Sequence, residues 1–449
     1  MNLNRTLLAL AAMLLPVALW ADDGTTEPKP ITLTAEEQGL VNNSNDFALR
    51  LFKEARTEGS MVISPLSITY ALGMLNNGAA GVTRQEICQT LGFGDTGADG
   101  INAFCRKLLT ESPTLDELTK VMISNAIFLN EPRYFLPEFL EIAHTYYDAE
   151  TQTRNFGDGE TMNVINQWAS DHTMGMIDEI LKEDSFDPEA ASYLLNAVYF
   201  KGTWTLKFNK DETQDEVFNG GGSVPMMHLQ NNLPYVENDD YQALILPYGN
   251  QAYRMTILLP REGKTIDDVL NKLDAKKWSN LRRMPTELVD VKLPRFETDT
   301  NINLVDIMKA LGMPSAFDPI AADIPYYCNL NQFISKMFQS GKIKLDEEGT
   351  EAAAVTVIET YDNAMPDDPK LYEFHANRPF LYFISEQSTG VIFFVGQYTT
   401  EGFTAHIDQP DISKNTGNTY YNLNGQRLSK QPAKGIYIEG STGRKMVVR

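Results

Sequence analysis

Apolar positions in this chain follow a helical spacing in the first third and form strand-like runs in the last half. Residues 61–63 form a short apolar strand, after which Ser64 can cap a helix and Pro65 suits its first turn. One face of that helix then carries Ile68, Ala71, Leu72 and Leu75. Other helical patterns cover 162–174 and 266–274, and strand-like runs cover 193–200, 254–259, 374–380 and 381–395. This order favours an α+β fold over alternating βαβ units.

The first 21 residues are typical of a secretory signal peptide. Arg5 precedes an apolar stretch that runs to Leu19, and Ala21 provides a small residue before two aspartates. A membrane anchor is the alternative, but Pro16 interrupts the run, which falls short of the roughly 20 residues that a span requires. We therefore expect a leader at 1–21, a linker at 22–33 and a secreted protein, whether extracellular, periplasmic or at the cell surface.

The C-terminal residues 401–449 differ in composition from the rest. Between residues 411 and 449 there are seven Lys or Arg and two acidic residues, whereas the whole chain has a formal charge of −22. Residues 420–440 read as short strands around Asn424 and Gly425, a pair typical of hairpin turns. This tail resembles the C-terminal sorting segments of many secreted bacterial proteins. We expect it to be an appendage to a globular body at 34–400.

Charge and composition exclude several functions. An acidic chain lacks the clustered Lys and Arg that a phosphate-binding surface needs, so we expect no nucleic-acid partner. Cys88, Cys105 and Cys328 are too few for a disulfide framework and allow one bond at most. The five histidines show no metal-ligand spacing. We expect neither a metal ion nor any other cofactor.

A glycine-rich stretch, GFGDTG at residues 92–97, matches the spacing that cradles a dinucleotide. A helix rather than a strand precedes it, and Asp95 would repel a phosphate, so we interpret it as a helix end followed by a loop. The chain has no nucleophile elbow, P-loop, kinase motif set or CxxC pair. Enzymatic activity therefore has no support from local motifs.

The most informative pattern is EEGTEAAAVTVIET at residues 347–360. As a strand, it would present one uncharged face, made of Thr350, Ala352, Ala354, Thr356 and Ile358. Three consecutive alanines favour helix over strand, so the segment has no strong commitment to either state. Residues 361–370 are acidic and contain two prolines, which predicts an exposed loop. Taken alone, the segment also fits an ordinary strand, loop and strand.

Short motifs follow one another in a fixed order through the body of the chain. They are ISPLSI at 63–68, ALGML at 71–75, NVINQW at 163–168, LNAVYFKGTW at 195–204, VPMM at 224–227, LPY at 246–248, LP at 259–260, LPRF at 293–296, EEGTEAAA at 347–354 and NRPF at 377–380. Their joint order over residues 34–400 resembles that of the serpins, a family of serine protease inhibitors. The resemblance implies a central mixed β-sheet with additional sheets, eight or nine helices and a mobile, exposed reactive loop.

The resemblance also implies roles for individual residues. The hinge of the reactive loop corresponds to Glu347, Gly349, Thr350, Ala352, Ala353 and Ala354. The shutter beneath the central sheet corresponds to Ser64, Ser67, Asn196 and Gln339, and the breach, where the loop would join the sheet, to Trp204 with Glu347. Helix capping is a simpler role for the two serines. Gln339 stands where the family usually has His, and because Gln does not titrate near neutral pH, a pH-sensitive opening of the sheet is in doubt.

The implied function is irreversible inhibition of serine proteases, with cysteine proteases as a further class. The family's spacing places the cut bond at Asn363–Ala364, and the alternatives Tyr361–Asp362 and Ala364–Met365 would suit chymotrypsin-like or elastase-like pockets better. Met365–Pro366 is excluded because proline after the cut bond blocks most serine proteases. Residues 350–369 contain no Lys or Arg, which disfavours trypsin-like targets.

Within the same family, a carrier or chaperone without inhibitory activity is the alternative function. The uncharged face of Thr350, Ala352 and Ala354 favours inhibition, because a strand with such a face can be buried. Residues 101–120 offer mainly Arg106 and Lys107, so no heparin-like cofactor is expected. We expect a monomer that is not an enzyme.

Overall fold

The computed structural model describes residues 28–183, 185–219, 221–350 and 370–399, together with four short strands between residues 420 and 448. The chain divides into two compact units, with the boundary between Glu401 and Gly402. The expected leader and the expected cut bonds lie outside the described residues.

The described part of the chain contains nine α-helices. They are α1 (Ala35–Ala55), α2 (Pro65–Gly78), α3 (Gly81–Leu91), α4 (Gly97–Glu111), α5 (Pro137–Tyr147), α6 (Glu160–His172), α7 (Ile266–Leu270), α8 (Ala275–Leu281) and α9 (Val305–Ala310). The start of α1 is fixed by a capping box between Thr34 and Glu37. As expected, Ser64 caps α2, because its side chain accepts a hydrogen bond from the Ser67 backbone N–H, and Pro65 follows at the first position. The glycine-rich stretch ends α3 at Gly92 in a left-handed conformation.

A central sheet of six strands positions the candidate site. Its order is β10 (Phe296–Asn303), β11 (Phe338–Asp346), β12 (Gly349–Thr350), β4 (Ser192–Thr203), β2 (Thr119–Asn130) and β3 (Glu150–Arg154). The sheet is mixed, since β2 and β3 are parallel and the other neighbours are antiparallel.

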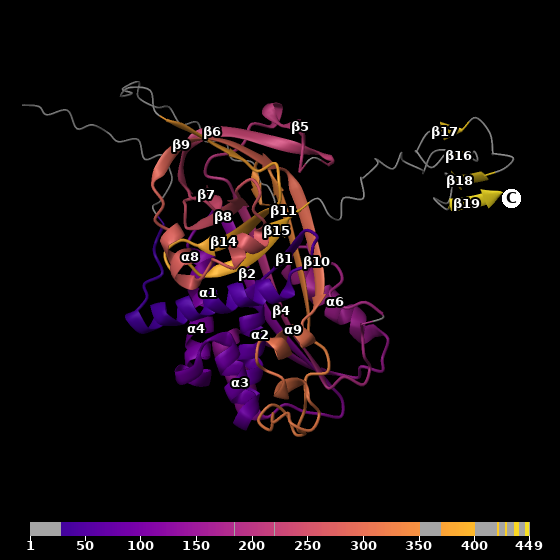
Figure 1. Ribbon diagram of the computed structural model, residues 1–449. Helices are drawn as coiled ribbons and strands as arrows, with labels where there is room; N and C mark the ends of the chain where they lie inside the picture. The colour runs from indigo at the N-terminus through magenta and orange to yellow at the C-terminus, as the bar shows by residue number, and fades with distance from the viewer. Residues whose placement is uncertain are drawn as a thin grey trace, which may run out of the picture. The chain divides into compact units, whose positions relative to one another are not determined.

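A second sheet has nine strands. Its order is β1 (Met61–Ile63), β15 (Ile392–Tyr398), β14 (Phe380–Glu386), β8 (Tyr253–Pro260), β7 (Tyr241–Tyr248), β6 (Ser223–Glu237), β9 (Thr286–Pro294) and β13 (Leu371–His375), and β5 (Gln214–Val217) also pairs with β6. Figure 1 shows helices α1–α4 gathered toward one end of this unit and β5, β6 and β9 at the other. The α+β class with a central mixed sheet is thereby confirmed.

The C-terminal unit contains a small four-stranded sheet. Its order is β17 (Arg427–Leu428), β16 (Tyr420–Tyr421), β18 (Gly435–Glu439) and β19 (Lys445–Val448). Tyr420 pairs with Leu428 and Tyr421 with Arg427, antiparallel, on either side of the expected Asn-Gly turn. The turn residues themselves lie outside the described part of the chain.

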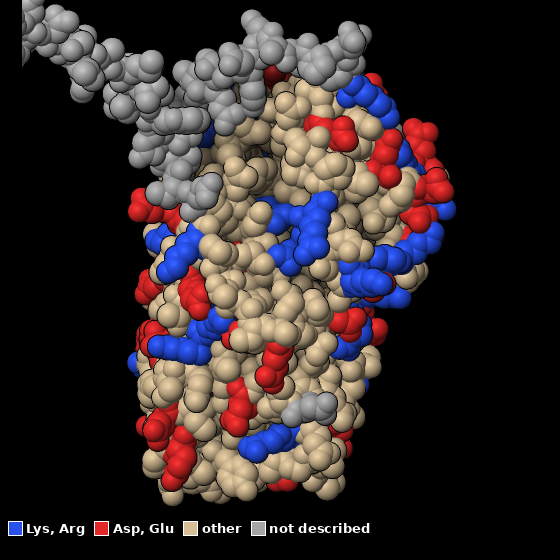
Figure 2. Space-filling view, turned by 90° about the vertical axis from the view of Figure 1, so that its left-hand side faces the viewer, with Lys and Arg blue, Asp and Glu red and all other residues tan. Residues whose placement is uncertain are grey.

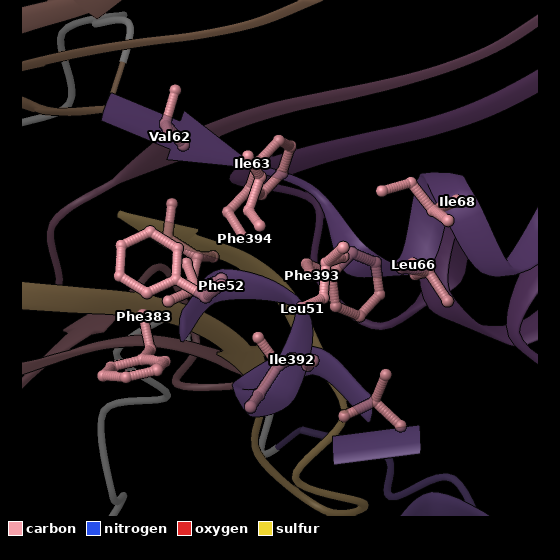
Figure 3. Close-up of a cluster of buried hydrophobic side chains, with 14 of the residues drawn as sticks. Leu51, Phe52, Val62, Ile63, Leu66, Ile68, Phe383, Ile392, Phe393 and Phe394 are labelled. Atoms are coloured by element: carbon pink, nitrogen blue, oxygen red, sulfur yellow. The ribbon is translucent and has the colours of Figure 1, made fainter. Parts of the chain in front are cut away.

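The main core joins the N-terminal helices to the last two strands of the body. Figure 3 shows side chains of α1, β1 and α2, such as Phe52, Ile63 and Leu66, packed against Phe383 and Phe393 of β14 and β15. The expectation of one buried face on α2 was too narrow: nearly every residue of this helix is buried, because α3, α4, α5, β4 and β15 all contact it.

Three expected elements differ from the sequence pattern in their bounds. The expected helix 266–274 ends at Leu270, and a new helix begins after Asp274, whose carboxylate accepts a hydrogen bond from the Lys277 N–H at 2.8 Å. The expected strand 374–380 ends at His375, because Asn377 turns back to donate to the His375 carbonyl at 2.8 Å and Pro379 has no N–H to pair. A turn at 387–391 also interrupts the expected strand 381–395.

Two glycines provide a stability test of this packing. At Gly396, an added methyl would collide with the Tyr382 ring and lie 2.7 Å from the Met61 carbonyl oxygen, whereas at Gly39 of α1 it would meet nothing within 4 Å. We expect Gly396→Ala to lower the free energy of unfolding by about 1–3 kcal/mol or more. Gly39→Ala should raise it by about 0.5–1 kcal/mol, since alanine favours a helix interior. Urea unfolding of both variants checks this, and equal effects would contradict the packing.

Candidate functional site

The site is the place where the chain leaves the central sheet. Gly349 and Thr350 form β12 between β11 and β4, with Thr350 opposite Leu345 on one side and Gly202 on the other. Among the described strands, β12 is the one that pairs with both β4 and β11. The first two residues of the expected hinge therefore already occupy a strand position inside the sheet.

Gly349 is required by this close approach. Its φ is +148°, and a Cβ there would overlap the Gly202 carbonyl oxygen and lie 2.9 Å from the Thr203 Cα. Only glycine adopts this backbone conformation without strain. The position therefore excludes any side chain.

Thr350 points beneath the sheet into the core. It is 1% exposed, and its Oγ1 lies 2.7 Å from the Tyr248 hydroxyl. The Tyr248 ring stacks on Trp204, with centroids 4.4 Å apart, and the Trp204 indole N–H donates to the Asp346 carbonyl at 3.0 Å. Burial raises the pKa of Tyr248 far above its usual range, so the hydroxyl stays neutral. Trp204 and Tyr248 together hold both ends of the turn that leads into β12.

Two glutamates hold that turn in place. Glu347 is buried and accepts a hydrogen bond from the Thr213 hydroxyl at 2.7 Å, while Arg295 lies 3.6 Å from its other oxygen. Glu348 forms ion pairs with Lys207 at 2.8 Å and Lys210 at 3.1 Å. The Lys207 contact is the main reason that the pKa of Glu348 is lowered, so this carboxylate remains ionised under mildly acidic conditions.

The expected shutter residues come together at the start of α2. Gln339 of β11 donates to the Ser64 carbonyl at 2.7 Å and accepts from the Ser64 N–H at 3.3 Å. The Ser67 hydroxyl donates to the Asn196 carbonyl of β4 at 3.4 Å, and the Asn196 amide donates to Asn125 Oδ1 of β2 at 2.7 Å. The first turn of α2 therefore bridges β11 and β4 from beneath the sheet.

A cavity of about 100 Å³ lies between β4 and β11 beyond β12. Residues 192–196 of β4 line one side, and residues 338–340 of β11 line the other. Several lining residues have buried polar atoms without a hydrogen-bond partner, namely Asn196 Oδ1, Gln332 Oε1 and Ser340 Oγ. Buried polar atoms without hydrogen bonds cost free energy, so the native state is less stable around this cavity than it would be with these atoms bonded.

The structure thus brings together Ser64, Ser67, Asn196 and Gln339 beneath the sheet. The structure also places Trp204, Glu347, Gly349 and Thr350 at the end of the central sheet where β12 pairs with β4 and β11. Ala352, Ala353, Ala354 and the expected cut bonds at Tyr361, Asp362, Asn363, Ala364 and Met365 lie outside the described residues. The roles assigned to all these residues stay predictions.

Sequence reasoning missed the partners of the hinge. Tyr248 stands in the LPY motif, which could have marked it, but no local pattern pairs Thr213 and Arg295 with Glu347. The described residues include no cluster of His, Cys, Asp or Glu that could hold a metal ion. Cys88, Cys105 and Cys328 are buried and unpaired. Among the described helices, none is long and apolar enough to cross a membrane.

The fold and this site define the class of protein. A family model described as Serpin (serine protease inhibitor) matches residues 42–400, and the chain belongs to the serpin family. Serpins are in general protease inhibitors rather than enzymes.

Individual relatives span most of this chain. An uncharacterized serpin-like protein of Thermococcus kodakarensis is 34% identical over 371 residues, which cover 81% of this chain and 86% of the relative. Human serpin B3 is 30% identical and covers 80% of this chain and 99% of its own. Among solved structures, the thermophilic serpin tengpin in its native state has a TM-score of 0.74 at 29% identity, and the match covers 84% of this chain and 98% of tengpin. Human thyroxine-binding globulin complexed with thyroxine has a TM-score of 0.72 at 25% identity, covering 81% and 98%.

The Gln339–Ser64 pair can be tested directly. Gln339→Ala leaves the buried Ser64 N–H and carbonyl without these partners, so we expect a loss of about 1–3 kcal/mol in the free energy of unfolding. Gln38→Ala on α1, where the side chain makes one exposed hydrogen bond at 3.5 Å, is the matched control and should change stability little. Chemical denaturation measures both. If the two variants unfold alike, the two bonds to Ser64 do not stabilise the native sheet.

Proposed function

We propose that this protein is an irreversible suicide-substrate inhibitor of serine proteases, with cysteine proteases as a further target class. In this mechanism a protease attacks the reactive loop and forms an acyl-enzyme, and the freed strand then inserts into the central sheet before the enzyme can hydrolyse the ester. The observation that carries the proposal is the position of β12, which is already paired with both β4 and β11.

Continuing the register of β12 gives the inserted strand specific neighbours. Six residues beyond Thr350 along the loop is Thr356, and six residues back along each partner are Asn196 of β4 and Gln339 of β11. The Thr356 hydroxyl would therefore reach the shutter, where Asn196 Oδ1 has no hydrogen-bond partner. A polar side chain at this position suits a polar site.

The face of the inserted strand also follows from Thr350. Since its side chain points into the core, residues at steps of two share that direction: Ala352, Ala354, Thr356 and Ile358. None of these is charged. The acidic side chains of Glu351 and Glu359 would face the opposite side of the sheet. This match between sequence and slot supports inhibition over the carrier or chaperone alternative.

The length of the slot supports the candidate cut bonds. The first residue of β4, Ser192, lies ten positions before Gly202, so it would pair with the residue ten positions after Thr350, which is Thr360. Tyr361–Asp362, Asn363–Ala364 and Ala364–Met365 all follow Thr360. Cleavage at any of them frees a strand that fills the slot. Its ten or so new residues, at a net ~1 kcal/mol per hydrogen bond, would release on the order of 10 kcal/mol.

The proposal includes targets and location. Elastase-like or chymotrypsin-like proteases fit a loop without Lys or Arg, and no heparin-like cofactor is needed. We propose that residues 1–21 direct secretion and that the tail at 401–449 serves sorting. Thyroxine-binding globulin carries thyroxine in its solved complex, so a small-molecule carrier is the competing function within this family.

The first test concerns the buried hinge side chain. We expect the natural protein to form an SDS-resistant complex with chymotrypsin or pancreatic elastase. Thr350→Arg should be cleaved without forming that complex, because a guanidinium does not fit beside Tyr248, where Thr350 is 1% exposed, and would keep the hinge from pairing with β4 and β11 ahead of the inserting strand. Glu36→Arg, the same new side chain on the exposed surface of α1, should trap normally. Full stoichiometric inhibition by Thr350→Arg would show that insertion is not the mechanism.

The second test concerns the stability of the cleaved form. Nicking a loop in an ordinary domain is neutral or harmful. Here a cut between Thr356 and Met365 should raise the melting temperature, because the freed strand pairs with β4 and β11 and fills the cavity between them. Calorimetry of intact and nicked protein, with the cut verified by mass spectrometry, measures the change. An unchanged or lower melting temperature would favour the carrier or chaperone function instead.

A further inference from the structure

A second pocket, of about 350 Å³, opens where four distant segments of the chain meet. They are the segment before α1, the start of β8, the loop after α8 and the turn between β14 and β15. Its lining residues are Pro28, Lys29, Pro30, Ala252, Arg254, Arg282, Arg283, Glu386, Gln387 and Ser388. None of them belongs to the hinge, breach or shutter. The volume lies within the range of small-ligand sites.

Four of the lining side chains are cationic and lack an acidic partner. Lys29, Arg254, Arg282 and Arg283 form no ion pair with any residue that the structure describes. Arg254 is 4% exposed and donates only to the backbone carbonyls of Arg282 at 3.4 Å and Gln387 at 3.2 Å. Arg282 likewise donates to backbone carbonyls of the 387–389 turn. The Nε atoms of both arginines are buried without a partner.

The one acidic residue of the pocket, Glu386, acts on Arg254 and Arg282 through its charge but forms no ion pair with either. Glu386 accepts hydrogen bonds from the Ser388 N–H at 2.6 Å and the Ser388 hydroxyl at 2.7 Å on one oxygen. Its other oxygen accepts from the Thr389 N–H and hydroxyl. The carboxylate is thus committed to its own turn, and four cations against one anion leave an excess of three positive charges in the pocket.

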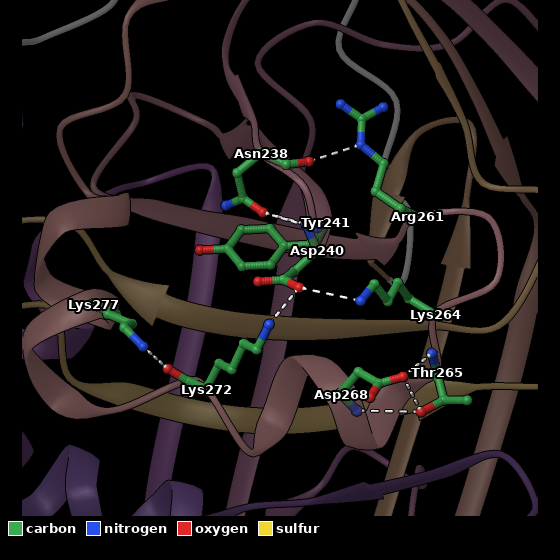
Figure 4. Close-up of polar contacts among 9 residues, drawn as sticks. All are labelled: Asn238, Asp240, Tyr241, Arg261, Lys264, Thr265, Asp268, Lys272 and Lys277. Atoms are coloured by element: carbon green, nitrogen blue, oxygen red, sulfur yellow. Dashed lines mark hydrogen bonds and ion pairs between the residues drawn. The ribbon is translucent and has the colours of Figure 1, made fainter.

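Basic residues between 261 and 272, close to the pocket residues in the sequence, do form ion pairs. Lys264 and Lys272 both contact Asp240, at 3.7 and 2.6 Å (Figure 4). Arg261 pairs with Glu237 at 2.9 Å. Figure 2 shows Lys and Arg side chains gathered amid uncharged surface on one face of a chain whose net charge is −22. The chain has 60 acidic and 38 basic residues, so the lack of ion pairs in the pocket is not explained by a shortage of acidic residues.

The pKa of Arg254 reflects its buried position. Burial, together with the charge of Arg282, lowers the pKa of Arg254 to about 10. The guanidinium is still protonated at neutral pH, so a buried positive charge persists beside a second one. The charge of Glu386 offsets part of this effect, but burying cations without an ion pair is costly, and an anion bound in the pocket would reduce that cost.

We propose that this pocket binds a small multivalent oxyanion, a phosphate or a polycarboxylate. Arg254 and Arg282 form the buried side of the site, and the exposed Lys29 and Arg283 form its mouth. Guanidinium groups match the geometry of such oxyanions. The bound anion ties the segment before α1 to the turn between β14 and β15. Because it binds the folded form, it raises the stability of this form by mass action.

The test uses the full-length chain with inorganic phosphate and citrate as probes, at constant ionic strength set with sodium chloride. We expect saturable binding by calorimetry and a rise in melting temperature. Lys29→Gln and Arg283→Gln should each weaken binding about tenfold, since each removes a charge-assisted contact. Arg106→Gln, an exposed arginine on α4 without an ion pair among the described residues, is the matched control and should bind like the natural protein.

The outcomes separate the possible ligands. Binding of phosphate alone assigns the site to tetrahedral oxyanions, and binding of citrate alone assigns it to carboxylates; both support an oxyanion site. The proposal is wrong if neither probe binds above the sodium chloride background. It is also wrong if Arg106→Gln weakens binding as much as Lys29→Gln and Arg283→Gln do.

Discussion

The pairing of two residues, Gly349 and Thr350, between β4 and β11 is the contact on which the central sheet depends. It holds the two strands a full strand's width apart at one end, and a cavity separates them further along. The glycine is needed because the Gly202 carbonyl lies against it, and the threonine is fixed by Tyr248. Any additional residue of the loop can pair next to one that is already in register, so closure costs little further chain entropy.

Beneath this gap, the start of α2 links the two sides. Ser64 is bonded to Gln339 of β11, and Ser67 to the Asn196 carbonyl of β4. A change in the spacing of the strands must alter one of these contacts. The helix is buried on nearly all sides, so it cannot follow both strands at once without disturbing the core shared with α1 and β15. A change in the spacing of β4 and β11 therefore also disturbs the packing of the hydrophobic core.

Local patterns in the sequence were sufficient for the parts of this structure that depend on neighbouring residues. The Ser64 cap, the strand before it and the helix end at Gly92 follow from local hydrogen bonding and backbone preference. The bond between Tyr248 and Thr350 and the contacts of Glu347 with Thr213 and Arg295 join residues far apart in the chain, and no periodicity encodes them. The same holds for the cationic pocket, whose walls come from four segments. Strand breaks at 376–379 and 387–391 depend on turns that an apolar count does not detect.

The cavity between β4 and β11 has a consequence for the volume of the molecule. A native state that encloses about 100 Å³ of poorly filled space occupies more volume than a state in which a strand fills it. Hydrostatic pressure favours whichever state eliminates internal voids. In an ordinary domain the denser alternative is the unfolded chain. Here a second folded state would share that advantage, so compression would drive the chain toward tighter order as well as toward unfolding.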